Sequence, residues 1–275
     1  TPIVNGATLH IPSEDEMLDP KRMREWFVTK DITVSHMTPQ FGYILAEGEN
    51  VPVVKSLKHI FFSGDILTVD LVKKLKKVAP NVICTNFYGA TETPQAMSYE
   101  TVSDTENHCE ITLGKPINSE VQLLIMNNAD QLCGFGEIGE ICIRTPYLSS
   151  GYINDESLTN AKFISNPFTN NNEDIIYKTG DIGYYLTDGR IVFCGRKDNQ
   201  VKVRGYRIEL REIEAALKTH PQVKNAAVNL FRDNQISESL VAYINFELDS
   251  KDNIENLRCY LNDLLPSYMV PKVFI

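Results

Sequence analysis

The first hundred residues alternate between segments with helical spacing of apolar positions and short apolar runs. Asp19 and Pro20 have the residue types of a helix N-cap and of the first helical position, and the apolar residues after them share one face. The predicted elements are a helix over 20–28, a β-rich run over 32–34, a helix over 68–78 and a strand over 82–85. Such alternation favours a layered α/β architecture.

Beyond about residue 110 the pattern changes to short strands separated by turn residues. Asp188-Gly189 lies between two of these strands and is a hairpin signal, because glycine tolerates the positive φ that such turns require. The predicted strands cover 121–126, 140–144, 182–186 and 190–194. We therefore expect this region to be predominantly antiparallel and half buried.

A polar link at 196–199 introduces a third pattern. Leu210, Ile213 and Leu217 follow helical spacing and share one face. The predicted elements are a strand over 200–203, a helix over 209–217, strands over 223–231 and 240–246, and a helix over 253–264. We expect a small α+β domain over 198–275, which follows a larger domain over 1–197.

Composition and charge narrow the classes of function. The chain has 275 residues, of which 43% are hydrophobic and 23% charged, as in an ordinary globular protein with a sizeable core. The formal net charge of −9 argues against an extended surface for nucleic acid, because phosphate binding needs clustered lysine and arginine. The lysine-rich run at 73–77 is interpreted as the solvated face of a helix.

Neither a membrane nor a disulfide framework is indicated. No apolar run approaches the roughly 18 residues that a membrane-spanning helix needs. The six cysteines are far apart and contain no C-x-x-C pair, which is typical of free thiols in a reducing cytosol, so we expect a cytoplasmic protein. The chain begins without methionine and ends on an apolar run, and we expect both ends to be cut from something longer.

Three polar clusters could carry chemistry. A strand leads into NFYGATET at 86–93, where glycine amides and threonine hydroxyls can bind phosphate while a carboxylate holds Mg²⁺. YKTGD at 177–181 is interpreted as a similar turn, whose carboxylate can accept hydrogen bonds from a ribose diol. The cation-rich run at 195–210 can approach a ligand at its glycines. Taken singly, each is also compatible with an ordinary polar turn or charged edge strand.

Together, the clusters resemble the motifs of adenylation domains, the AMP-binding, adenylate-forming domains of nonribosomal peptide synthetases. NFYGATET resembles their N-x-Y-G-P-T-E, and YKTGD resembles their Y-x-T-G-D. GRKDNQVKVRGYRIELREIE at 195–214 and LPSYMVP at 265–271 resemble two further motifs of the family, in the family's order and spacing. The resemblance implies a fragment of the adenylate-forming α/β and α+β fold: the C-terminal part of the large core and the small mobile subdomain.

The resemblance also implies roles at matching positions. Glu92 corresponds to the Mg²⁺-binding carboxylate and Thr91 to the hydroxyl near the α-phosphate of ATP. The remaining nucleotide contacts would come from Asn86, Tyr88, Gly89, Asp181 and Arg196. Asp198 corresponds to the hinge about which the small subdomain rotates between half-reactions, before transfer to the phosphopantetheine of a carrier protein.

The acid-binding pocket of this family is lined by residues scattered over the large domain. The matching positions here are His36, Phe61, Ser63, Phe87, Gln95 and Ala96. A lone histidine such as His36 can equally be a satisfied core residue.

Some positions depart from the family pattern. Ala90 replaces the usual proline, and the extension at 93–99 looks closer to α-aminoadipate-reductase-like adenylation domains. Nothing before Phe41 resembles the family's phosphate loop, and the chain stops shortly after Pro271, before the position of the catalytic lysine. We therefore expect these 275 residues to be an incomplete catalyst.

The resemblance implies a ligase that converts a small carboxylic acid, such as an amino acid, and ATP to acyl-AMP and pyrophosphate. Thioester transfer to a peptidyl or acyl carrier protein would follow, in nonribosomal peptide or related natural-product biosynthesis. Two alternatives remain open. One is an acyl-CoA ligase of the same superfamily, and the other is a noncatalytic module that keeps the fold and docks a carrier protein or a helper subunit.

Overall fold

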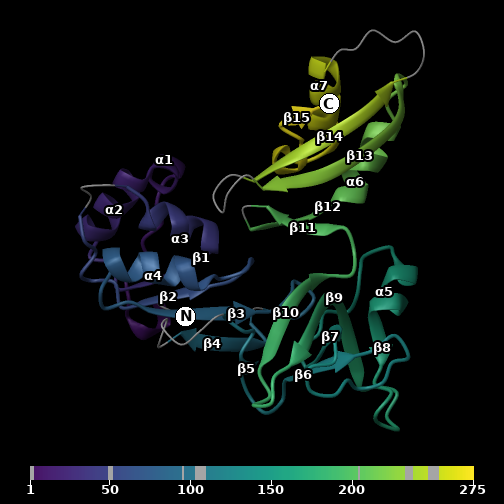
Figure 1. Ribbon diagram of the computed structural model, residues 1–275, viewed down its shortest axis with the longest axis horizontal. Helices are drawn as coiled ribbons and strands as arrows, with labels where there is room; N and C mark the ends of the chain where they lie inside the picture. The colour runs from purple at the N-terminus through teal and green to yellow at the C-terminus, as the bar shows by residue number, and fades with distance from the viewer. Residues whose placement is uncertain are drawn as a thin grey trace. The chain divides into compact units, whose positions relative to one another are not determined.

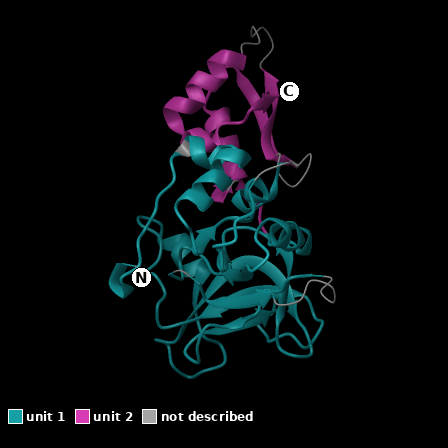
Figure 2. Cartoon of the chain, turned by 90° about the vertical axis from the view of Figure 1, so that its left-hand side faces the viewer, with its two compact units in different colours: residues 1–197 teal, residues 198–275 magenta. Residues whose placement is uncertain are grey.

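The computed structural model (Figure 1) describes residues 3–48, 52–94, 96–102, 110–203, 205–232, 238–246 and 254–275. The chain divides into two compact units, one over residues 1–197 and the other over residues 198–275 (Figure 2). The first unit contains two sheets and most of the helices. The second contains a hairpin and a small sheet packed on helices.

The first sheet is mixed and has the strand order β1-β2-β3-β4-β5. Its strands are β1 (Val34–Met37), β2 (His59–Phe62), β3 (Ile83–Tyr88), β4 (Ser98–Val102) and β5 (Lys115–Pro116). The first three are parallel, and β4 and β5 join antiparallel. Parallel neighbours need a crossover, which helices supply here. Both strands predicted in this region exist, but their ends differ from the prediction. Residues 32–33 precede β1, and β3 continues to Tyr88.

Helices cover one side of this sheet (Figure 1). They are α1 (Glu14–Leu18), α2 (Pro20–Thr29), α3 (Pro39–Ala46) and α4 (Val69–Val78), after a short 3₁₀ turn η1 (Ile3–Asn5). A side chain at Gly42 of α3 would lie 2.8 Å from the ring of Phe62, so glycine permits the helix to approach β2 closely. The predicted start of α2 is confirmed, because the Asp19 carboxylate accepts from the Arg22 backbone N–H at 2.8 Å.

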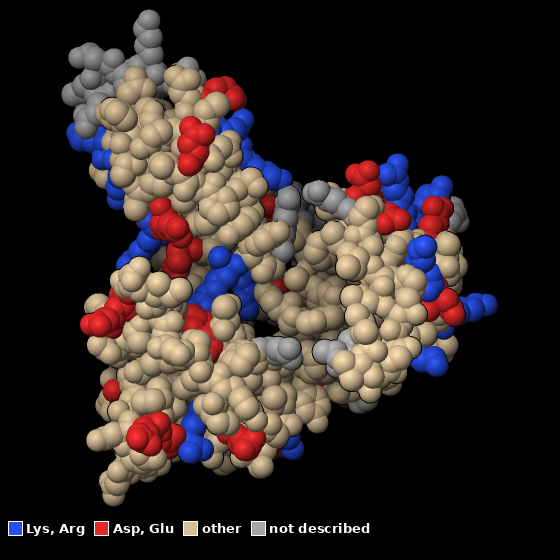
Figure 3. All heavy atoms as spheres, turned by 180° about the vertical axis from the view of Figure 1, so that it is seen from behind, with Lys and Arg blue, Asp and Glu red and all other residues tan. Residues whose placement is uncertain are grey.

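The lysine-rich run forms the solvent side of α4. Lys73, Lys74 and Lys77 are exposed, whereas Leu75 of the same helix is fully buried. Lys74 pairs with Asp70 at 2.8 Å. The interpretation of this run as a solvated helix face is thus confirmed. On the face drawn in Figure 3, acidic and basic side chains are scattered in small groups of both signs.

The second sheet is antiparallel throughout, as the sequence predicts, with the order β10-β9-β7-β6 and β8 on β9. Its strands are β6 (Gln122–Met126), β7 (Gly139–Arg144), β8 (Phe163–Ser165), β9 (Ile175–Tyr185) and β10 (Ile191–Arg196), with α5 (Glu156–Lys162) before β8. The Asp188-Gly189 turn between β9 and β10 is confirmed by the positive φ of Gly189, 83°. Tyr88 of β3 and Met97, just before β4, share a buried core with Ile125 and Ile141 of the second sheet.

One sequence interpretation is wrong. YKTGD is not a turn, because residues 177–181 lie inside β9 and pair with both β7 and β10. The positive φ of Gly180, 80°, produces a bulge in the strand rather than a reversal of the chain. Tertiary pairing on both sides overrides the turn preference of the local residues.

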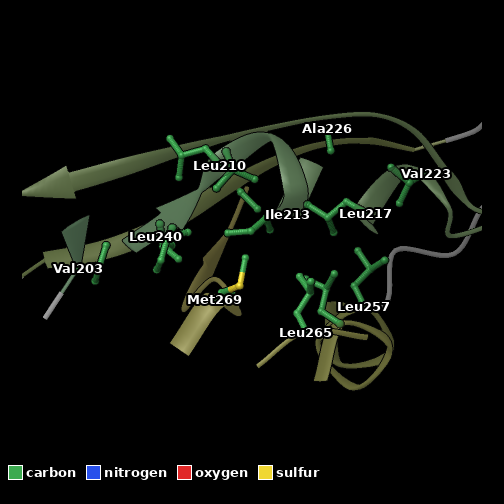
Figure 4. Packing of buried hydrophobic residues seen from close by; sticks show 14 residues of the cluster. Val203, Leu210, Ile213, Leu217, Val223, Ala226, Leu240, Leu257, Leu265 and Met269 are labelled. Carbon is green, nitrogen blue, oxygen red and sulfur yellow. The ribbon is translucent and has the colours of Figure 1, made fainter. Parts of the chain in front are cut away.

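The second unit has its own core. It contains β11 (Gln200–Val203), β12 (Tyr206–Glu209), α6 (Leu210–Lys218), β13 (Val223–Arg232), β14 (Glu238–Phe246), α7 (Ile254–Leu264), η2 (Ser267–Met269) and β15 (Val273–Phe274). Figure 4 shows Leu210, Ile213 and Leu217 of α6 pointing into this core, together with Leu257 of α7 and Leu240 of β14. The predicted apolar face of α6 is therefore confirmed.

Ile213→Val is expected to lower the free energy of unfolding by about 0.5 to 1.5 kcal/mol, because Ile213 is 0% exposed and the lost methylene leaves a gap. Urea unfolding measures the change. Ile254→Val is the matched control, since Ile254 is 42% exposed and its variant should unfold like the parent chain. Equal losses in both variants would contradict the packing of α6 described here.

Candidate functional site

The turn after β3 is closed by a buried threonine. The Thr93 hydroxyl accepts from the Ala90 N–H at 3.0 Å and donates to the Ala90 carbonyl at 3.2 Å. Thr93 is fully buried, whereas Thr91 is exposed and Gly89 is half-buried. The turn thus presents the Thr91 hydroxyl to solvent and turns Glu92 inward.

Asp181 is the centre of a buried polar cluster formed from three distant segments. Its Oδ2 atom accepts from the Tyr88 hydroxyl at 2.7 Å, and its Oδ1 atom accepts from the Arg196 guanidinium at 2.5 Å. Arg196 also donates to the Thr179 carbonyl at 3.1 Å. Burial, and then the negative charge of Asp181, raise the pKa of Tyr88 well above its usual value, so Tyr88 is a neutral donor.

Two β-bulges bring the side chains of this cluster together. Gly180 and Gly195 have φ values of 80° and 126°, and both lie at register shifts of β9 and β10. After the shift in β10, Arg196 is directly opposite Asp181. The Thr179 hydroxyl holds the bulge, because it donates to the Ile141 carbonyl at 2.6 Å and accepts from the Asp181 N–H at 2.9 Å. The bulges therefore place the side chains of Asp181 and Arg196, which have opposite charges, next to each other.

Glu92 is buried and contacts a residue that sequence reasoning missed. Its Oε1 atom accepts from the Tyr152 hydroxyl at 2.6 Å, and Glu92 is only 6% exposed. The Ser149 N–H also donates to the Glu92 carbonyl oxygen at 2.9 Å. Tyr152 lies 60 positions from Glu92 in the sequence, in a segment without a helical or strand pattern, so no local signal indicates the contact.

Glu92 can supply one carboxylate ligand to a magnesium ion whose other ligands come from elsewhere. Within the described residues, no group of three or more His, Cys, Asp or Glu side chains could form a protein cage for a metal. Burial raises the pKa of the Cys84 and Cys142 thiols to about 12, so neither is a thiolate ligand at neutral pH. Mg²⁺ commonly takes one or two carboxylates, and the phosphates of its nucleotide complete the coordination.

Asn86 lies on β3, before the turn. Its side-chain amide donates to the Thr112 carbonyl at 3.0 Å, and the residue is 6% exposed. Tyr88 is 7% exposed, so only a small part of its ring is accessible to a ligand. Asn86 therefore ties β3 to the segment before β5, and Tyr88 ties it to Asp181 of the second sheet.

Four of the predicted pocket residues come together on one face of the first sheet. The rings of Phe61 and Phe87 are stacked with centroids 5.2 Å apart, and His36 meets Phe87 edge-on at 6.4 Å. The His36 Nε2 atom lies 2.9 Å from the Ser63 hydroxyl. The alternative of a buried core histidine is wrong, because His36 is exposed.

The other predicted positions are Ala96, Gln95 and Asp198. Ala96 is half-buried, Gln95 lies outside the described residues, and Asp198 begins the second unit, where its Oδ1 atom accepts from the Gln200 N–H at 3.3 Å. A cavity of about 580 Å³ lies elsewhere in the first unit, between Glu120, Arg144 and Asp174, and none of the predicted site residues lines it. In the described part of the chain, no helix is long and apolar enough to cross a membrane.

Two family models match the chain. The model described as AMP-binding enzyme matches residues 1–153, and the model described as AMP-binding enzyme C-terminal domain matches residues 212–275. Together these matches include the turn with Glu92 and most of the second unit. Asp181 and Arg196 lie between the two matched ranges.

Several curated proteins are similar over the whole of this chain. L-2-aminoadipate reductase of Schizosaccharomyces pombe is 34% identical over 325 residues, tyrocidine synthase 3 of Brevibacillus parabrevis is 35% identical, and gramicidin S synthase 2 of Aneurinibacillus migulanus is 37% identical. The matches cover 100% of this chain but only 23%, 4% and 6% of those proteins. The chain thus spans less than a quarter of each relative.

Solved structures share the fold. The Vibrio cholerae adenylation domain AlmE, in complex with glycyl-adenosine-5'-phosphate, has a TM-score of 0.84 at 23% identity and covers 99% of this chain and 51% of its own. PA1221, a nonribosomal peptide synthetase protein containing adenylation and PCP domains, has a TM-score of 0.78 at 26% identity, with 94% and 50% covered. Both chains are about twice as long as the matched region.

Proposed function

Because the chain belongs to the AMP-binding enzyme family, we propose that its parent protein is an adenylate-forming ligase that activates a carboxylic acid with ATP. A carboxylate oxygen of the acid attacks the α-phosphorus, the bond to the β-phosphate oxygen breaks, and pyrophosphate leaves. The acid is already ionised at neutral pH, so the attack requires no general base.

The single observation that carries this proposal is the Asp181 cluster. The carboxylate is 6% exposed and is held on both oxygens, by Tyr88 and by Arg196. Each carboxylate oxygen has two lone pairs, so one site on each remains for the two hydroxyls of a ribose. This arrangement supports the assignment of Asp181 as the acceptor of a ribose diol, with Arg196 balancing its charge and contacting the nucleotide.

Glu92 is the residue that would hold Mg²⁺, which when bound supplies neutralisation of the phosphate charge. Thr91 and Gly89 belong to the same turn, and we assign them to the phosphate oxygens. Thr91 is exposed at the tip of the turn, which supports this assignment. The turn and its carboxylate thus position the triphosphate, and Asn86 and Tyr88 behind the turn would face the adenine.

The His36 cluster is the proposed acid-binding surface. Stacked Phe61 and Phe87 offer an apolar wall, and the imidazole and hydroxyl of His36 and Ser63 offer a polar end. A small amino acid or related acid has these two kinds of surface. Gln95 and Ala96, just after the turn, complete the proposed set.

The second half-reaction would transfer the acyl group to the phosphopantetheine thiol of a carrier protein. PA1221 contains adenylation and PCP domains, which supports a carrier protein as partner. We assign Asp198 as the hinge, and its position at the first residue of the second unit supports that role. The pathway would be nonribosomal peptide or related natural-product biosynthesis in the cytosol.

Exchange of labelled pyrophosphate into ATP tests the proposal on the full-length parent polypeptide. Across a panel of amino, keto and aryl acids, one acid or a group of similar acids should support exchange. A full-length protein that binds no ATP and exchanges with no acid would contradict the catalytic proposal, and the module that only docks a carrier protein would take its place.

A further inference from the structure

Tyr152 lies beside Glu92 but takes no part in the proposed reaction itself. Its hydroxyl donates to Glu92 at 2.6 Å, the short distance expected when a phenol bonds an ionised carboxylate. We propose that Tyr152 is a positioning residue that sets the direction of the Glu92 carboxylate toward a nucleotide-bound divalent cation, an inference that rests on the proposed function.

The backbone of Tyr152 is anchored on a helix turn. Its N–H donates to the Thr159 hydroxyl at 2.9 Å, and that hydroxyl donates to the Asp155 carbonyl at 2.7 Å. Gly151 has a φ of 116°, and a β-carbon there would lie 2.5 Å from the Thr159 side chain. Only glycine permits this close approach, so α5 holds Tyr152 in place.

The ring of Tyr152 is held as well. It meets Phe163 edge-on at 5.8 Å, and its hydroxyl lies 3.4 Å from that of Tyr177, which is fully buried. The Ser149 N–H ties the same segment to the Glu92 backbone at 2.9 Å. Both partners of the Tyr152–Glu92 bond are therefore attached to one frame, and the bond is more than a chance contact of two flexible side chains.

This arrangement has a chemical consequence for Glu92. A carboxylate has about four acceptor sites, and the phenol occupies one on Oε1 and restrains rotation of the group. The other sites keep a constant direction, and Mg²⁺ demands near-ideal octahedral geometry from its ligands. Loss of the hydroxyl should weaken binding of the cation with its nucleotide and leave binding of the nucleotide alone unchanged.

A second tyrosine–glutamate pair provides a matched control. Tyr147 donates to Glu120 at 3.0 Å through the same chemical groups, and Tyr147 lies close to Tyr152 in the sequence. Both Tyr147 and Glu120 are exposed, however, and neither belongs to the predicted site. Tyr147→Phe removes the same hydroxyl, without the proposed role.

The test is the affinity of the full-length protein for α,β-methylene-ATP, measured by calorimetry with Mg²⁺ and again with EDTA. The ratio of the two affinities is the gain that depends on magnesium. Tyr152→Phe should reduce this gain by about tenfold, which corresponds to about 1.4 kcal/mol, with the affinity in EDTA unchanged. Tyr147→Phe should keep both affinities.

The outcomes separate the two proposals. If Tyr152→Phe keeps the full gain, or lowers both affinities equally as a merely structural residue would, the role of Tyr152 is overturned. If the parent protein itself shows no affinity for the nucleotide, the proposed function fails instead. Thr159→Val is a second variant, for use if Tyr152→Phe does not fold. It removes the acceptor of the Tyr152 N–H but keeps the Tyr152 hydroxyl, and it should also reduce the magnesium-dependent gain, by less than about tenfold.

Discussion

Asp181→Asn is expected to destabilise the chain by about 3 to 5 kcal/mol, because it breaks a buried ion pair with Arg196. The side chains of Arg196 and Asp181 are only 14% and 9% exposed, so the ion pair is largely shielded from solvent. The same change removes an ionised acceptor for a ribose diol. Charged hydrogen bonds contribute about 1.5 to 3 kcal/mol each, so ATP affinity should fall by about 10- to 100-fold or more.

Urea unfolding and calorimetric titration with ATP measure the two effects. Asp188→Asn is the control, since Asp188 pairs with Arg190 at 2.8 Å in the turn between the same two strands but is 49% exposed. Exposed ion pairs contribute little, so this variant should match the parent in both measurements. If both variants lost comparable stability and ATP affinity, burial of the Asp181 cluster would not be the cause of its contribution to either quantity.

Glu92→Gln is expected to lower pyrophosphate exchange by about 100- to 1000-fold, the usual effect of removing one key electrostatic group. Glutamine keeps the size of the side chain and an oxygen that can accept from Tyr152, so the turn should keep its structure. The charge that would hold Mg²⁺ is lost, and affinity for ATP in EDTA should therefore be unchanged.

Exchange rates over a series of Mg²⁺ concentrations distinguish this role from a general loss of structure. Glu120→Gln removes the charge of another glutamate that accepts from a tyrosine, at 3.0 Å, but on the surface. It should leave the rate and its Mg²⁺ dependence as they are. A Glu92→Gln variant as active as the parent would exclude Glu92 as the metal-binding carboxylate.

Local patterns predicted the secondary structure well where one residue decides a boundary or one face is clearly apolar. Asp19 caps α2, Gly189 takes the positive φ of the β9–β10 turn, and Leu210 with its neighbours forms the buried face of α6. Strand ends were less accurate, because the pairing of β1 and β9 depends on neighbours that are distant in sequence.

The candidate site divides in the same way. The sequence indicated Glu92, Asp181 and Arg196, because their motifs resemble those of a family, and the family matches later assigned the chain to it. The sequence could not indicate Tyr152, and it left His36 between a core and a pocket role. The exposure of His36 and its contact with Ser63 exist only once β1 and β2 pair in register.

By itself, the sequence determined the helices with strong caps or apolar faces, the antiparallel character of the region after residue 110 and the family. These depend on backbone preference, periodicity and residue type, which are local properties. Only the tertiary structure decided that YKTGD is a bulged strand and that Tyr88, Asp181 and Arg196 meet. Those contacts join residues up to 93 positions apart, and they depend on two bulges and a shared core that no single segment specifies.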